Sequence, residues 1–399
     1  MCLLCYSGLQ VSFGKPQLIA AMLLLMFLLQ CVWLAAHTPV SGAELQQHAS
    51  SPLPSVLHSP LTSLLATAPA SLLHTMPDAT SPFWWLVLRA VFITAGVLLG
   101  AAVWYIARRL YGNVAGYIAL ILYCFSPAMI AHSSTVAPEI IAAWGAFGLV
   151  WTGIATAHTL YAPREVVLWN WKRIVLLAIA IALGVGGQFS VALLIPLTLV
   201  FMFYLVPHRL GAALAIMAAA CALALLLLFG VYRLHPREFV GALRHAAWAE
   251  FSTQMIRQAA AWKMLGFFLL NNSAGLVLLL AIALITFSAW KRTRYFGTTA
   301  PLLTSAFLVL CVMLMPSAGG FSFLIVMLPF IIVFTAGVCV DLLESQNIAA
   351  RSLATGVIIA VLITHALFSV VHLAHFSPSP QERLRAPHAG VSGEFRKNR

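Results

Sequence analysis

Long apolar stretches separated by short polar segments fill most of the sequence. A helix needs about 20 residues to cross the hydrocarbon core of a bilayer, and about eleven stretches reach or approach that length. The fifth and the ninth are short, so we expect them to begin earlier or to tilt less than the others. The predicted spans are Leu18–Ala36, Phe83–Ala107, Val114–Ala131, Ile140–Ala157, Ile174–Gly187, Phe189–Val206, Leu210–Tyr232, Met264–Trp290, Pro301–Met315, Phe321–Val340 and Leu353–His372.

This pattern predicts an all-α polytopic membrane protein, because helices satisfy their own backbone hydrogen bonds in lipid. Apolar residues make up 62% of the 399 positions and charged residues 8%, whereas a soluble domain carries about a quarter charged residues. We assign residues 1–17 to a cytoplasmic N-terminus, 18–372 to the transmembrane domain and 373–399 to a basic C-terminal tail. The first span is longer than the apolar core of about 7–15 residues in a signal peptide, so we expect an uncleaved anchor.

The positions of Lys and Arg predict the orientation of the spans. With the N-terminus inside, the short inner loops carry many of these residues, whereas the first outer loop, residues 37–82, contains none. The outer segments His132–Pro138 and Pro316–Gly320 contain none either, in agreement with the positive-inside rule. Two regions disagree, because residues 233–263 and the tail after His372 each carry five basic residues and are placed outside.

The net charge of +12 does not indicate nucleic-acid binding, because the basic residues lie in short loops between apolar stretches. They are better explained as topology signals and phosphate contacts. Cys2 and Cys5 form a single C-x-x-C without a second pair, and the other five cysteines fall within apolar stretches. We therefore predict neither a zinc site nor a disulfide framework. The oligomeric state cannot be read from the sequence.

The outer segment 233–263 has a pattern of its own. Apolar residues recur at helical spacing from Phe239 to Trp262, with basic residues between and beside them. This pattern is typical of an amphipathic helix that lies in the membrane interface. Its basic residues are candidate phosphate contacts, and binding of anionic membrane lipids explains them equally well. They are Arg237, Arg244, Arg257 and Lys263.

Only ten residues are acidic, and no predicted span has an obvious carboxylate in its interior. This distribution argues against a transporter driven by protons or sodium ions. Glu44 follows the first span closely, and its simplest interpretation is a solvated loop acid. Glu139 follows Pro138 at the start of the fourth span, where a carboxylate in the first turn is ordinary for a helix start.

Two further polar residues lie near the outer ends of predicted spans. Arg89 is close to the start of the second span and is either a snorkelling anchor or a contact for an anionic ligand. Gln188 lies in the short turn Gly186-Gly187-Gln188-Phe189-Ser190, where a polar residue is expected by default. Composition alone assigns no chemistry to either residue.

Several segments in fixed order resemble a known family. From Arg89, which opens a span, the order is an Arg-Arg-Leu-Tyr-Gly turn, an Ala-rich span ending in Phe-Ser-Pro, a His-Ser-Ser segment and then an acid. This order resembles the polyprenyl-phosphate-dependent membrane glycosyltransferases of the GT-C fold, especially the protein mannosyltransferase and aminoarabinose transferase group. The segments are Arg108–Gly112, Phe125–Pro127, His132–Ser134 and Glu139.

Further segments add to the resemblance. His58-Ser59-Pro60-Leu61 is similar to the family's His-Pro-Pro-Leu after the first span, and Leu183–Ser190 is similar to its Leu-Gly-…-Lys-Phe-Ser turn. Pro329-Phe330 resembles the Leu-Pro-Phe of its late spans. The likeness covers residues 18–206 well and the rest of the chain only by hydropathy and loop order.

The resemblance implies a GT-C-like fold and transfer of a sugar from a polyprenyl-phosphate donor to a lipid, glycan or protein acceptor. Glu44 matches the Glu of the family's Asp-Glu pair, whose acid is the catalytic base, while Ala43 replaces the Asp. Glu139 replaces the second-loop Asp, and Gln188 replaces a Lys. By the same resemblance, the segments of His58 and Arg89 belong to the substrate site. It also implies a hexosyl- or pentosyltransferase of the bacterial inner membrane whose active face is periplasmic.

Two alternatives remain open at this point. A non-catalytic relative that binds lipid-linked sugar fits the three replaced positions, and a lipid or solute transporter fits the hydropathy. The long first outer loop favours a catalytic surface outside the membrane, and no internal repeat of the transporter kind is evident. A divalent cation beside the phosphate is also left open, although no clustered set of ligands predicts one.

Overall fold

The computed structural model describes residues 16–38, 61–62, 64–66, 68, 82–160, 171–232, 234–235, 237, 239–240, 252–314 and 320–375. Every regular element in these ranges is helical, as predicted. The α-helices are α1 (Pro16–His37), α4 (Pro82–Tyr111), α5 (Asn113–Cys124), α6 (Pro127–Ser133), α7 (Pro138–Thr159), α9 (Trp171–Gly187), α10 (Leu194–Leu205), α11 (Leu210–Val231), α13 (Gln254–Arg257), α14 (Ala259–Asn272), α15 (Ala274–Ala289), α16 (Phe296–Leu314), α17 (Leu328–Leu343) and α18 (Ile348–His375). Short 3-10 segments include η1 (Phe189–Leu193), η4 (Lys291–Thr293) and η5 (Gly320–Met327).

Seven described helices are long and apolar enough to cross a membrane, and the number rises to nine if two bent helix pairs each count as one span. The chain is therefore a multi-pass membrane protein, and the described residues do not confirm the predicted count of about eleven spans. Helix α9, the fifth predicted span, has 17 residues and α10 has 12, so both fall short. Helix α16 begins at Phe296, before the predicted Pro301, and so reaches 19 residues.

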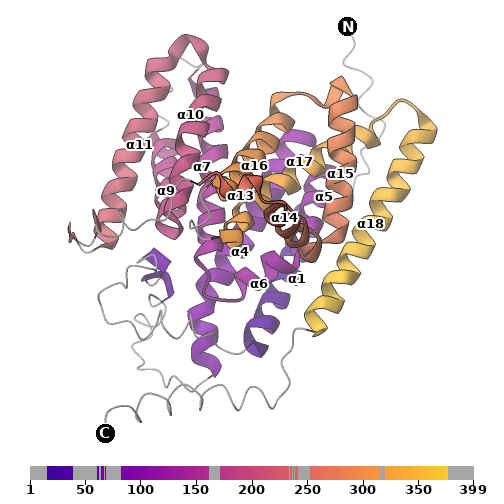
Figure 1. Ribbon diagram of the computed structural model, residues 1–399, viewed down its shortest axis with the longest axis horizontal. Coiled ribbons are helices and arrows are strands. Elements are labelled where there is room, and N and C mark those ends of the chain that lie inside the picture. Colours follow the sequence, from indigo (N-terminus) through magenta and orange to yellow (C-terminus); the bar gives the residue numbers. More distant parts are fainter. Residues whose placement is uncertain are drawn as a thin grey trace.

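The helices form a bundle around α17 (Figure 1), which is buried along its whole span. Helices α4, α5, α15, α16 and α18 pack around it. Helices α11 and α18 lie at opposite edges in this view, and only 22% of each span is buried. Leu226 of α11 and Leu367 of α18 are each more than 60% exposed, as expected for side chains that face lipid.

Helices α7 and α9 approach each other through glycine. A Cβ added to Gly145 on α7 would clash with the backbone of Gly184 on α9, and one added to Gly187 would lie 2.8 Å from the backbone nitrogen of Ala142. Without a hydrophobic driving force between helices in lipid, small residues of this kind allow the close packing that holds them together. The contact places the last turn of α9 beside the first turns of α7.

The bundle has an outer end and an inner end. The outer end is where α1 ends at His37 and where α4 and α7 begin. The inner end is where α4 ends at Tyr111, α16 begins and α17 ends at Leu343. The names follow the orientation predicted from Lys and Arg, which stays a prediction.

Part of the predicted interfacial segment, residues 233–263, lies outside the described residues. Its described part contains α13 and then α14, which meets α15 at an angle of 111°. Trp262 and Phe267 on α14 are exposed. Whether this segment lies in the membrane interface stays a prediction.

The glycine contact gives a direct test of the packing. We expect Gly145→Ala to lower the unfolding temperature in detergent, because overpacking at a close helix contact costs about 1–3 kcal/mol. Gly356→Ala on α18 is the matched control, since a Cβ there meets nothing within 4 Å and Ala favours a helix. Equal unfolding temperatures for the two variants, measured by differential scanning fluorimetry, would contradict the packing described.

Candidate functional site

Glu139 lies in the first turn of α7, at the outer end. Ala137 is extended, Pro138 occupies the first helical position and Glu139 follows it, which is the helix start that the sequence predicts. The Oε2 atom of Glu139 is 3.8 Å from Nδ1 of His132 on α6. Both side chains are partly exposed, at 18% and 28%, so a ligand can reach them. The helix start fixes the acid in place, with His132 beside it.

Gln188 lies next to this first turn. Its backbone is extended and ends α9, and its N–H donates to the carbonyl oxygen of Gly184 at 2.9 Å. A Cβ at the preceding Gly187 would be 3.1 Å from the carbonyl oxygen of Pro138. The structure therefore brings together the elements that carry Gln188 and Glu139, although they are far apart in the sequence.

Arg89 is fully buried on α4, so the interpretation as a lipid-facing snorkelling anchor is wrong. Its Nη1 donates to the carbonyl oxygens of Ala35 at 2.6 Å and of Thr38 at 3.1 Å. The last carbonyls of a helix have no partner within it and carry partial negative charge, so a guanidinium stabilises them. Arg89 thus holds the end of α1 at His37, and Glu44 follows seven residues later in the sequence.

Parts of two other segments meet α9 at Gly186. A Cβ at Gly186 would lie 2.8 Å from Cδ2 of Leu228 on α11 and at similar distance from Leu61 of the first outer loop. Thr62, next to Leu61, is buried. The outer end therefore gathers α7, α9, α11 and a described piece of the first outer loop around Gln188.

The predicted basic residues are only partly accounted for. Arg237 is exposed beyond the outer end of α11. Arg257 and Lys263 are exposed on α13 and α14, which pack on α16 and α15 respectively. The other predicted site residues, Glu44, His58 and Arg244, lie outside the described residues.

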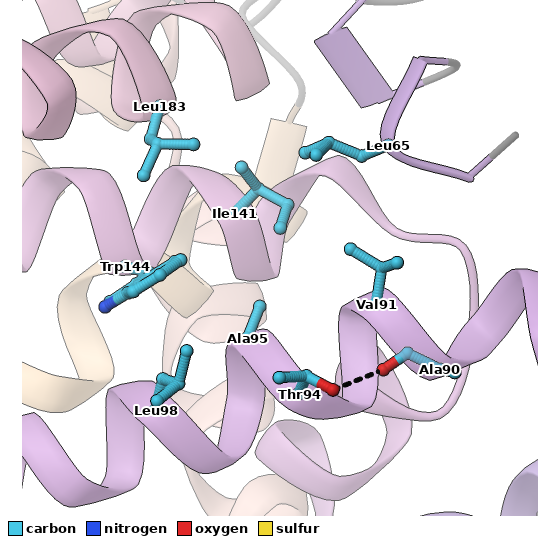
Figure 2. Close-up of a pocket in the computed structure, with 9 residues that line it drawn as sticks. All are labelled: Leu65, Ala90, Val91, Thr94, Ala95, Leu98, Ile141, Trp144 and Leu183. Atoms are coloured by element: carbon cyan, nitrogen blue, oxygen red, sulfur yellow. Dashed lines mark hydrogen bonds between the residues drawn. The ribbon is translucent and has the colours of Figure 1, made fainter. Parts of the chain in front are cut away.

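An apolar groove runs beside the outer end between α4, α7 and α9 (Figure 2). It encloses about 260 Å³, with Val91, Ala95 and Leu98 on one side and Ile141 and Trp144 on the other. Leu183 of α9 and Leu65 complete the wall. The hydroxyl of Thr94 donates to the carbonyl oxygen of Ala90, and Leu98 is 43% exposed, so the groove offers hydrocarbon and opens sideways.

The groove lies close to the polar residues along each helix. Ala90 follows Arg89, Ile141 is two residues after Glu139, and Leu183 is five before Gln188. At a rise of 1.5 Å per residue these separations are at most about 8 Å along the helix axes. A molecule with a polar head at Glu139 and a hydrocarbon chain could therefore place the chain in the groove.

Sequence reasoning missed two parts of this site. From the sequence, His132 was named only as part of the His-Ser-Ser segment. Its place seven residues before Glu139 could have predicted that the two side chains lie together. The groove was not predicted, because its residues are ordinary apolar positions on three helices and only the packing shows that they leave space. Within the described ranges, no three His, Cys, Asp or Glu side chains gather into a metal site.

No family model matches the sequence, and no curated protein does. Solved structures of the Archaeoglobus fulgidus oligosaccharyltransferase AglB are similar in fold. The apo form has a TM-score of 0.57 at 12% identity, with 96% of this chain and 59% of that chain covered. The complex with Zn and sulfate has a TM-score of 0.56 at 14% identity, with coverage of 90% and 53%. The complex with an inhibitory peptide and a dolichol-phosphate has a TM-score of 0.50 at 12% identity, with coverage of 90% and 56%.

This chain therefore spans little more than half the length of the oligosaccharyltransferase that it resembles. At such low identity the likeness establishes the fold alone. The fold is GT-C-like, as the sequence resemblance implies, while the subgroup within that fold is not determined.

Proposed function

We propose that the protein is a glycosyltransferase that moves a sugar from a polyprenyl-phosphate donor to a lipid, glycan or protein acceptor at the outer end. The observation that carries the proposal is the meeting of Glu139, His132 and Gln188 beside an apolar groove in a GT-C-like fold. A polar site at a helix bundle's end with a hydrocarbon groove beside it suits an amphipathic donor, whose head must react in water and whose chain stays in lipid.

The chemistry requires two kinds of group. An acceptor hydroxyl attacks the anomeric carbon, the bond from that carbon to the phosphate oxygen breaks, and polyprenyl phosphate leaves. A carboxylate takes the hydroxyl proton, which is the role we assign to Glu44, with Glu139 as the supporting acid. Cations stabilise the charge that develops on the phosphate, and the candidates are Arg237, Arg244, Arg257 and Lys263.

The neighbouring structures support a lipid-linked phosphate in general terms. One AglB structure holds a dolichol-phosphate, which has the chemistry that the groove and the outer end of this chain suit. Another holds Zn and sulfate. In the described part of this chain no three His, Cys, Asp or Glu side chains gather, and the pair of His132 and Glu139 does not make a metal site, so no step here is assigned to a metal.

The two acids give the central test. Purified protein is incubated with labelled polyprenyl-phosphate sugars, and transfer of the label to acceptor lipids, glycans or peptides is measured. We expect Glu44→Gln to lower transfer by about 100-fold or more and Glu139→Gln by about tenfold, since loss of a general base costs about 10²–10⁴-fold. Glu344→Gln, an exposed acid at the inner end, is the matched control and should leave transfer unchanged.

The outcomes separate the alternatives. Transfer that is indifferent to both acids would overturn the site assignment. Binding of a donor without turnover of any donor would favour a non-catalytic relative. Flux of a lipid or solute through proteoliposomes without transfer of sugar would favour a transporter.

The groove gives a second test. We expect Thr94→Trp, which fills the groove from an exposed position on α4, to raise the KM for long-chain donors more than for donors truncated to one or two isoprene units. Leu225→Trp on the lipid-facing side of α11 is the control. If both variants leave the dependence on chain length unchanged, the chain binds elsewhere.

Arg89 gives a third test, as a positioning residue. We expect Arg89→Gln to leave the carbonyl oxygens at the end of α1 without a cationic donor. This loss should lower the free energy of unfolding by about 1–3 kcal/mol. It should also lower kcat, because the chain that leads from α1 to Glu44 is no longer held in place. Limited proteolysis within residues 39–60 should become faster in this variant, a readout that general destabilisation of the bundle would not confine to that segment. Arg109→Gln, exposed at the inner end, is the control.

A further inference from the structure

A second polar cluster lies at the inner end, away from the site described above. Helix α17 continues through Leu343, so Asp341 is part of a buried helix and not of a loop as its place after the predicted span suggested. Asp341 is 8% exposed, and its Oδ2 atom is buried without a hydrogen-bond partner in the described part of the chain. An ionisable residue at the end of a membrane helix points to function, because its burial is costly.

Three helices meet at this carboxylate. Gly337 lies one turn before Asp341 on the same face of α17, and a Cβ there would be 2.6 Å from Cζ of Tyr111 on α4. The Tyr111 hydroxyl donates to the carbonyl oxygen of Gly297 on α16 at 2.7 Å. Thr298, the next residue, is fully buried, and its Oγ1 lies near the hydroxyl of Tyr295 without a hydrogen bond of good geometry in the described part of the chain.

Tyr295, which precedes α16, shares these surroundings. Burial raises the pKa of Tyr295 to about 12, the hydroxyl of Thr298 opposes that rise, and the negative charge of Asp341 adds to it. Its ring packs edge-on against Tyr111, with centroids 6.0 Å apart. Asp341, Thr298 and Tyr111 therefore lie around one small volume.

Arg292 of η4 is close enough to attract the charge of Asp341, but it bonds to a different acid. Arg292 of η4 bonds to Oε2 of Glu344 through Nη2 at 2.9 Å, and both side chains are nearly half exposed. Arg108 lies over the ring of Trp104 beside Gly116 of α5, and the exposed Arg109 donates to the hydroxyl of Tyr105. A buried carboxylate without a partner is unfavourable, so something must neutralise it.

The available atoms favour a small cation. They are a carboxylate oxygen, a Thr hydroxyl, a Tyr hydroxyl and a backbone carbonyl, which together form a set of hard oxygen ligands. One carboxylate balances one positive charge, whereas a divalent ion would leave a net charge in a buried place. We propose that Asp341, Thr298, Tyr111 and the carbonyl of Gly297 bind a monovalent alkali cation that joins the inner ends of α4, α16 and α17.

Cation-dependent stability tests this proposal in the full-length protein. Unfolding temperatures are measured in detergent with lithium, sodium or potassium chloride, against N-methyl-D-glucamine chloride at equal ionic strength. Because a ligand that binds the folded state alone stabilises it, we expect one alkali cation to raise the unfolding temperature by about 2–5 °C in a saturable way. The measurement is independent of glycosyl transfer, so either proposal can fail alone.

Variants locate the effect. Asp341→Asn and, separately, Thr298→Val should abolish or weaken the cation-dependent rise, while Glu344→Gln should retain it. Thr298→Val keeps the test decisive if Asp341→Asn does not fold. Equal unfolding temperatures in alkali and N-methyl-D-glucamine chloride would overturn the proposal, as would a rise that persists in both variants. Stability that follows pH and not the identity of the cation would assign the position to a proton and also overturn it.

Discussion

The close contact between α7 and α9 is the constraint on which the outer end depends. Gly145 meets the backbone of Gly184, and Gly187 meets the first turns of α7. Helix α9 therefore ends beside the residues at which α7 begins. A side chain at any of these glycines would separate the helices by the width of that side chain. Glu139 and Gln188 would then no longer share one surface, and Leu183 would leave the groove wall.

The lipid around the bundle explains why polar groups gather at its two ends. Within the spans a polar side chain needs a partner in the protein, as when His365 of α18 bonds to Ser273 and to the carbonyl oxygen of Leu122. At helix ends the backbone itself is short of partners, and charged side chains can supply them. Arg89 does so for α1. The two polar clusters of this protein thus have the same physical origin and face opposite ends of one bundle.

Hydropathy was enough to predict the helical class, since most spans lie close to their predicted positions. It could not give the number of spans by itself, because α9 and α10 are shorter than a bilayer requires and α5 with α6 forms a bent pair. The helix start at Pro138 and Glu139 followed from local rules. The burial of Arg89 and of Asp341 did not, because whether a charge near a helix end faces lipid, water or protein depends on neighbours distant in the sequence.

The neutral Gln188 has a consequence for the proposed mechanism. Where the glycosyltransferase family that the sequence resembles has a Lys, this chain has an amide, which can orient a ligand by hydrogen bonds but adds no positive charge. Arg89 of α4 already donates to the end of α1. In the proposed mechanism, a departing phosphate at the outer end would take its counter-charge from the basic segment that follows α11, where Arg237, Arg257 and Lys263 are exposed. Under that proposal the basic residues that disagree with the positive-inside rule serve the ligand and not the topology.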